Sequence, residues 1–188
     1  MTIFSYIIKD FKQPLDYIPA GIAAAFFACV FINVVYMAFY RFTKRRTVPP
    51  RSAAALKNIL LFVFILYIFV VLQEAFFSRP PGSRNSVNMT LLDTWGESFQ
   101  SKAYVIENVL MFIPFGFLLP ALLPPFRRLW LCMLTAVALS TLLEYVQYVT
   151  ARGHCQLDDV VMNTLGAVIG GLIFRFVFLS LTIPKPHK

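Results

Sequence analysis

The stretch Ile59–Leu72, with the sequence ILLFVFILYIFVVL, decides what kind of protein this is. It carries no charged residue, and with its flanks it gives an apolar segment over Asn58–Phe77. A helix needs about 20 mainly apolar residues to cross a bilayer. The sequence therefore predicts an all-α protein, a polytopic bundle of five transmembrane helices. The other four predicted spans are Ala20–Tyr40, Ala103–Leu123, Leu129–Thr150 and Val160–Ile183.

The composition of the whole chain supports this class. Of the 188 residues, 59% are hydrophobic and only 14% are charged, against roughly 45–50% and about 25% in soluble domains. Those values exclude a soluble enzyme, a disordered chain and a coiled coil. We expect a single transmembrane domain over residues 20–183. Residues 1–19 are expected to form a tail or a short interfacial helix, and residues 184–188 a C-terminal tail.

The excess of basic residues indicates topology rather than nucleic-acid binding. The net charge is +8, and the basic residues cluster between apolar runs. Ten of them fall after the first span, after the third span and in the C-terminal tail, against six in the other connecting segments. Because cytoplasmic loops are enriched in Lys and Arg, we predict a bacterial cell-membrane protein with its N-terminus outside and its C-terminus cytoplasmic. Membrane lipids are the expected partners, and nucleic acid is not.

Polar residues recur at one depth in three of the predicted spans. With the predicted topology, all of them lie in the outer leaflet. A buried acid there needs a partner or a water-filled cavity, since a charge in a span costs about 2.5–3.5 kcal/mol. We predict that these residues form one ligand-binding site. Its members are Asn108, Glu144, Gln147, Arg152, Asp158, Asp159 and Asn163.

Helical spacing suggests how these spans pack. Gly166 and Gly170 form a GxxxG pair, which permits close approach of another helix. We expect that helix to be the fourth span, which would bring Asn163 against Glu144 or Gln147. Pro114 and Gly116 are expected to shape the packing of the third span. Simpler interpretations remain open. Asp158 and Asp159 are also typical of a helix N-terminus, and Asn108 and Asn163 of hydrogen bonds between helices.

Taken in order, these residues resemble the motifs of the VanZ-like family of bacterial membrane proteins. The resemblance covers residues 105–175 and consists of the ordered set N…PxG…SxxxExxQ…R…DD…NxxG. The family commonly has an acid where this chain has Gln156, and that difference argues against a bound cation. The resemblance implies a role in low-level resistance to teicoplanin-type glycopeptides or in cell-envelope homeostasis.

Three kinds of function follow. The first is a module that binds an amphiphile such as an envelope lipid, a lipid-linked wall precursor or a lipoglycopeptide, with Arg152, Arg79 and Arg84 as anion partners. The second is an enzyme acting on a lipid head group, with Glu144 as general base and Asp158 and Asp159 holding Mg²⁺ or Ca²⁺. The third is a proton-coupled transporter or flippase, which with five helices would act as a homo-oligomer.

We favour the binding module over an enzyme. The sequence offers no nucleophile–base pair, and His154 is expected to be a solvated loop residue. Cys29, Cys132 and Cys155 have neither paired spacing for zinc nor a disulfide framework. No cofactor or metal is therefore expected.

Overall fold

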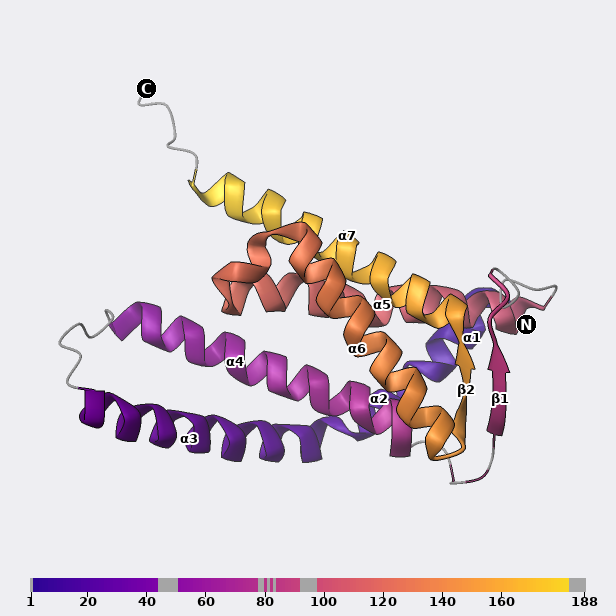
Figure 1. The fold of residues 1–188 in the computed structure, drawn as a ribbon, viewed down its shortest axis with the longest axis horizontal. Coiled ribbons are helices and arrows are strands. Elements are labelled where there is room, and N and C mark those ends of the chain that lie inside the picture. The colour runs from indigo at the N-terminus through magenta and orange to yellow at the C-terminus, as the bar shows by residue number, and fades with distance from the viewer. Residues whose placement is uncertain are drawn as a thin grey trace.

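The chain folds into a bundle of long helices (Figure 1), and the predicted all-α membrane architecture is confirmed. The computed structural model describes residues 2–43, 51–77, 80, 82, 84–91 and 98–182. Within these residues, five helices are long and apolar enough to cross a membrane. The elements, in order, are α1 (Ile3–Asp10), α2 (Lys12–Asp16), α3 (Ile18–Thr43), α4 (Arg51–Leu72), η1 (Gln73–Phe77), β1 (Arg84–Asn88), α5 (Phe99–Leu122), η2 (Pro124–Arg127), α6 (Leu129–Val149), β2 (Arg152–Gln156) and α7 (Leu157–Thr182).

Some expectations concern residues that lie outside the described ones. The C-terminal tail 184–188 and Arg79 lie there, as do residues 44–50 of the basic loop. Arg84 begins β1, but its side chain is also outside the described set.

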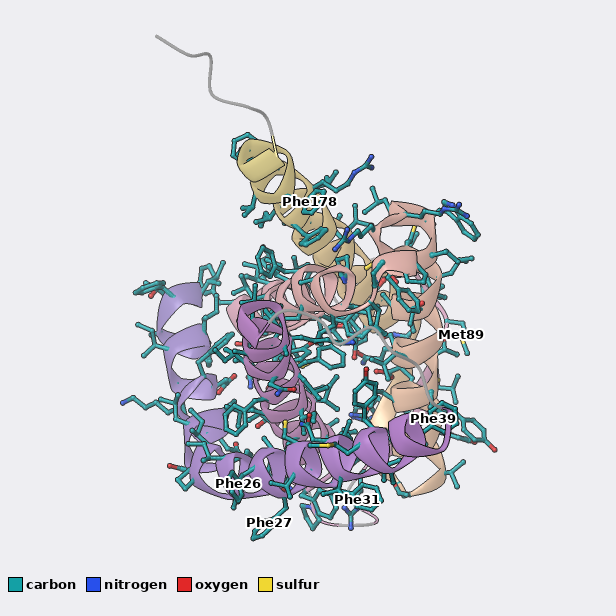
Figure 2. All side chains as sticks on the ribbon, turned by 90° about the vertical axis from the view of Figure 1, so that its left-hand side faces the viewer. Phe26, Phe27, Phe31, Phe39, Met89 and Phe178 are labelled. Atoms are coloured by element: carbon teal, nitrogen blue, oxygen red, sulfur yellow. The ribbon has the colours of Figure 1, made fainter. Side chains whose placement is uncertain are left out.

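Helix α3 presents apolar side chains around most of its circumference. Figure 2 shows Phe26, Phe27 and Phe31 projecting from it, and they are 57%, 70% and 68% exposed. Side chains this apolar are expected to face lipid when a helix has few protein neighbours. Helix α3 packs mainly against α4. The two helices therefore form a hairpin on one side of the bundle (Figure 1).

The core lies around α5, which contacts α4, α6 and α7. Phe112 of α5 is fully buried, and Cys132 and Ala136 of α6 are 1% and 0% exposed beside it. Phe115 continues this cluster towards Phe64 of α4, at 6.2 Å between ring centroids. The central position of α5 explains why its polar residues meet residues from several other helices.

The glycines of α7 pack against α5, not against α6 as the sequence suggested. A Cβ atom at Gly166 would lie 2.1 Å from the carbonyl oxygen of Val109, and one at Gly170 equally close to that of Ile113. Gly116 of α5 is the reciprocal position, where an added Cβ would lie 1.9 Å from the carbonyl oxygen of Ala167. A GxxxG pattern shows that a helix can approach closely. It does not specify which helix does so.

Two prolines lie inside α5, and each loosens a turn because proline has no N–H to donate. Pro120 leaves the Gly116 carbonyl without its helical donor, and the Cys132 thiol of α6 lies 3.9 Å from that oxygen. Near Pro114, the Tyr67 hydroxyl donates to the Met111 carbonyl at 2.9 Å. Pro114 itself is exposed, and its expected part in shaping the packing of this span stays a prediction.

A short pair of strands is a regular feature that the apolar pattern did not indicate. The segment 152–156, expected to be a loop, forms β2 and pairs in parallel with β1, with Ser86 opposite His154. Ala151, at φ 51°, turns the chain from α6 into β2. Both strands lie at one end of the bundle (Figure 1), where α6 ends and α7 begins, and both contact α6.

The N-terminal segment is helical and lies at the same end as the strands (Figure 1). Helix α1 packs against α5, and α2 connects it to α3. Phe4 and Ile8 of α1 are 70% and 46% exposed. The segment that the sequence left as a tail or an interfacial helix therefore has a defined place beside the first turns of α5.

Candidate ligand-binding site

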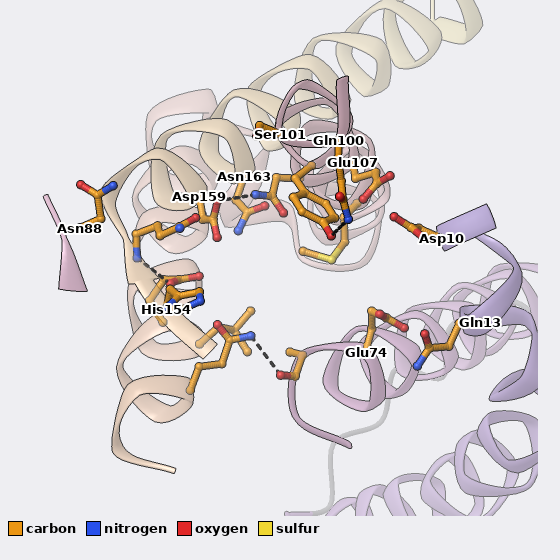
Figure 3. Close-up of a pocket in the computed structure, with 18 of the residues that line it drawn as sticks. Asp10, Gln13, Glu74, Asn88, Gln100, Ser101, Glu107, His154, Asp159 and Asn163 are labelled. Carbon is orange, nitrogen blue, oxygen red and sulfur yellow. Dashed lines mark hydrogen bonds between the residues drawn. The ribbon is translucent and has the colours of Figure 1, made fainter. Parts of the chain in front are cut away.

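A cavity of about 780 Å³ lies at the end of the bundle that carries α1 and the two strands (Figure 3). Its walls come from eight elements: α1, α2, η1, β1, α5, α6, β2 and α7. It is lined by Asp10, Gln13, Glu74, Ala75, Asn88, Ser98, Gln100, Ser101, Tyr104, Glu107, Asn108, Met111, Leu143, Glu144, Gln147, His154, Gln156, Asp159 and Asn163. Five of the seven predicted site residues are among them, and only Arg152 and Asp158 are not.

Asn108 and Asp159 connect α5 to α7 across the cavity wall. The Asn108 side-chain amide donates to Oδ1 of Asp159 at 2.7 Å. Asp159 lies in the first turn of α7, where a carboxylate is also stabilised by the helix dipole. Asp159 therefore both begins α7, as is typical of acids at a helix N-terminus, and lines the predicted site.

Glu144 is held at the junction of α6 and β2. It is 5% exposed, and its Oε2 accepts a hydrogen bond from the Gln156 backbone N–H at 3.0 Å. Hydrogen bonds to an ionised acceptor are stronger than neutral ones. Gln156, where the family commonly has an acid, therefore stabilises Glu144 through its backbone N–H.

Asn163 brings α7 against α6 inside the cavity. Its side-chain amide donates to the Ser140 hydroxyl at 2.8 Å, one turn away from Glu144 on the same stripe of α6. Asn163 was expected to lie against Glu144 or Gln147, and its hydrogen-bond partner is Ser140 on the same face of α6. Asn163 is 3% exposed, and among the described residues its Oδ1 has no hydrogen-bond partner.

Gln147 and Arg152 hold η1 in place. Gln147 donates to the Ala75 carbonyl at 3.0 Å, and Arg152 donates to the Phe76 carbonyl. Because η1 ends at Phe77, its last carbonyls have no donor within the helix. The Arg152 guanidinium also lies 5.4 Å from the Phe77 ring centroid. Arg152 is thus bound to η1 and does not line the cavity, and its role as an anion partner stays a prediction.

Asp158 is also in a different place from the one predicted. It is 2% exposed and does not line the cavity, whereas its neighbour Asp159 does. Two successive residues of a helix point in directions about 100° apart, since a turn takes 3.6 residues. In the part of the chain that the structure describes, no group of three or more His, Cys, Asp or Glu residues is arranged to hold a metal ion.

The structure adds three acids and a histidine that were not in the predicted site. Asp10, Glu74 and Glu107 line the cavity, and Figure 3 shows them on the side opposite His154 and Asp159. His154 was expected to be solvated, but it is half-buried and its Nδ1 is hydrogen-bonded to the Ser86 hydroxyl. Glu107 could have been included from the sequence because it precedes Asn108 in the same polar turn.

A second, apolar groove of about 230 Å³ adjoins the cavity. It contains the side chains of Phe11, Tyr67, Val70 and Leu110, and its wall includes the exposed ring of Pro114. Four residues line both spaces: Asp10, Glu74, Glu107 and Met111. The polar cavity and the apolar groove therefore meet along a shared boundary.

Cys155 lies outside the spans, in β2, beside the acids of the site. Burial raises the pKa of its thiol, and the negative charges of Glu144 and Asp159 raise that pKa further. Its thiolate form is therefore disfavoured, which makes this cysteine a reporter of the charge in the cavity.

Comparison with known proteins agrees with the motif resemblance and extends it. The chain is 32% identical over 93 residues to "Protein VanZ" of Enterococcus faecium, which covers 46% of this chain and 51% of that protein. The aligned region thus spans about half the length of this relative. No solved structure matches the chain. The family model described as VanZ/LLP1 matches residues 23–179, including the first two spans, which the motifs did not involve. Because that match covers most of the sequence, this chain belongs to the VanZ/LLP1 family.

Proposed function

We propose that this membrane protein binds an amphiphilic component of the cell envelope, with the polar head in the cavity and the apolar part in the adjoining groove. The continuity of the two spaces is the observation that carries the proposal. Glu107 and Met111 lie one turn apart on α5 and line both of them. A ligand that fills both spaces needs a polar and an apolar part next to each other.

The size and lining of the cavity support a ligand rather than a packing defect. Ligand sites usually have volumes of about 300–1,000 Å³ and a few convergent polar groups, and this cavity has about 780 Å³. The Asn163 Oδ1 atom, without a partner among the described residues, offers an acceptor to such a ligand. An envelope lipid, a lipid-linked wall precursor and a lipoglycopeptide all have the required two-part chemistry.

We place the cavity in the outer leaflet. It lies at the end of the bundle opposite η2, where Arg127 and Arg128 are exposed between α5 and α6. The positive-inside rule assigns that basic turn to the cytoplasm. Binding at the outer surface would connect the protein with the response to teicoplanin-type glycopeptides that the family resemblance implies.

Lipid analysis of the purified protein tests the proposal. Material that co-purifies with the wild type is compared with that from Glu144→Gln, which removes the charge but keeps the shape, and from Tyr145→Phe. Tyr145 is the next residue of α6 but is 61% exposed, so it is the matched control. We expect Glu144→Gln to lose about nine-tenths of a specific amphiphile, because hydrogen bonds to charged groups contribute about 1.5–3 kcal/mol.

The same variants are compared for teicoplanin susceptibility in a strain that lacks the native gene. Glu144→Gln should lose the phenotype at unchanged membrane abundance, and Tyr145→Phe should keep it. If Glu144→Gln retained both the phenotype and the co-purified amphiphile, the proposed binding function would be refuted.

A further inference from the structure

The boundary between the cavity and the groove is acidic. Asp10 of α1, Glu74 of η1 and Glu107 of α5 line both spaces. The three side chains come from different elements, and Asp10 and Glu74 both act electrostatically on Glu107. A head group whose tail lies in the groove would pass directly between these carboxylates.

The rest of the cavity adds further negative charge. Five carboxylates line it in all, and none of its described lining residues is Lys or Arg. Asp159 accepts from Asn108, and Glu144 accepts from the Gln156 backbone. A head group whose only charge is a phosphate or pyrophosphate would be repelled here, because like charges in a site of low dielectric constant repel strongly.

Two buried acceptors point to a ligand that donates hydrogen bonds. The Oε1 atom of Glu107 is buried, and no described residue donates to it. Asn163 is 97% buried, its Oδ1 likewise has no partner among the described residues, and its side chain lies in the cavity (Figure 3). Buried acceptors are rarely left without a donor in folded proteins. Each of these two oxygens could accept a hydrogen bond from a ligand that donates.

We propose that the amphiphile bound here carries a primary ammonium in its head group, held between Asp10, Glu74 and Glu107. This inference rests on the proposed amphiphile-binding function and specifies its ligand class. An ammonium has three N–H donors and no acceptor, which complements three carboxylates around one boundary. Its attachment close to an apolar chain matches the position of the groove. An amino lipid and a soluble amphiphilic amine share this chemistry.

The test uses three short amphiphiles that have the same chain: octylamine, octyl glucoside and octyl phosphate. Binding is measured by calorimetry on the full-length protein in phosphatidylcholine nanodiscs, with empty nanodiscs subtracted. We expect octylamine to bind roughly tenfold or more tighter than octyl glucoside, the ratio given by one charged hydrogen bond. Octyl phosphate should bind most weakly.

Glu107→Gln tests the carboxylate directly, and Asp16→Asn is the control. Asp16 is an exposed acid of α2 that lines neither space. Glu107→Gln should weaken octylamine about tenfold and leave octyl glucoside unchanged, which also shows that the variant is folded. Asp16→Asn should change neither affinity.

The outcomes separate the two proposals. Equal affinity for octylamine and octyl glucoside, or no effect of Glu107→Gln, would overturn the ammonium inference and leave amphiphile binding standing. Absence of saturable binding for all three amphiphiles would overturn the proposed function itself. Phosphatidylethanolamine in the nanodisc should compete with octylamine if the natural ammonium belongs to a lipid. If it does not compete, the ammonium belongs to a soluble amphiphile, and either result supports the ammonium.

Discussion

Replacing Gly116 by alanine should weaken the contact between α5 and α7 more than its single methyl group suggests. The added Cβ would lie 1.9 Å from the Ala167 carbonyl oxygen, whereas carbon–oxygen contacts settle at about 3.3 Å. The helices would have to separate by about 1.4 Å at that point. Because the obstacle is main chain, no side-chain rotation relieves it.

The expected cost follows from this geometry. Overpacking a core costs about 1–3 kcal/mol, and a clash with the backbone belongs at the upper end, so we expect about 3 kcal/mol. For a chain of this size that corresponds to a melting temperature about 6–12 °C lower. The apparent melting temperature can be measured from the monodisperse fraction that survives heating in detergent.

Gly171→Ala is the matched control for this experiment. Its Cβ would meet Cδ1 of Leu129 at 2.8 Å, and the end of a leucine side chain can move aside. We expect its melting temperature to stay within about 2 °C of the wild type, equivalent to less than about 1 kcal/mol. Equal melting temperatures for Gly116→Ala and Gly171→Ala would refute the inferred closeness of α5 and α7.

Three further outcomes are expected. Alkylation of Cys155 at pH 8 should be slower than that of a free thiol, because the pKa of Cys155 is raised. Glu144→Gln should accelerate the alkylation about two- to threefold by increasing the thiolate fraction. An unchanged rate would contradict the contribution of the Glu144 charge. In a thermal-unfolding assay, Arg152→Ala should destabilise the protein by about 1.5–3 kcal/mol through the lost hydrogen bond to η1, yet leave the affinity for octylamine near wild type. Loss of affinity at full stability would instead make Arg152 a ligand contact. In a cysteine-free background, an impermeant reagent added to cells should label Met89→Cys and not Arg128→Cys, and the reverse pattern would place the cavity on the cytoplasmic side.

The spans could be predicted from the sequence because crossing a bilayer requires a long apolar run, and that requirement is local. Contacts between helices are less local. The sequence led us to expect Asn163 against Glu144 or Gln147, and the structure places it against Ser140, one turn from Glu144 on α6. The partner of Gly166 could not be identified, since small residues permit an approach from any neighbour.

The acids at the boundary show a different reason for failure. Asp10 lies in a segment whose composition fits a tail as well as a helix, and only its packing beside α5 brings it to Glu107. Arg152 was assigned to the site because it is the cation nearest to Glu144 in sequence. The strand pairing and the open carbonyls of η1 direct it instead to Phe76.

The arrangement of α1 and β2 has a consequence for synthesis of the protein. Residues near the start of the chain and residues after its fourth span meet around one cavity, and chains are made from the N-terminus at about 5–20 residues per second. The face of α1 that packs on α5 therefore stays uncovered until α5 has been made. Strand β1 stays unpaired until β2 has been made, after both α5 and α6. A ribosome stalled within α6 would hold at most three complete spans and no finished cavity. The membrane quality-control machinery would then encounter Asn108 of α5 before its partner Asp159 of α7 has been made.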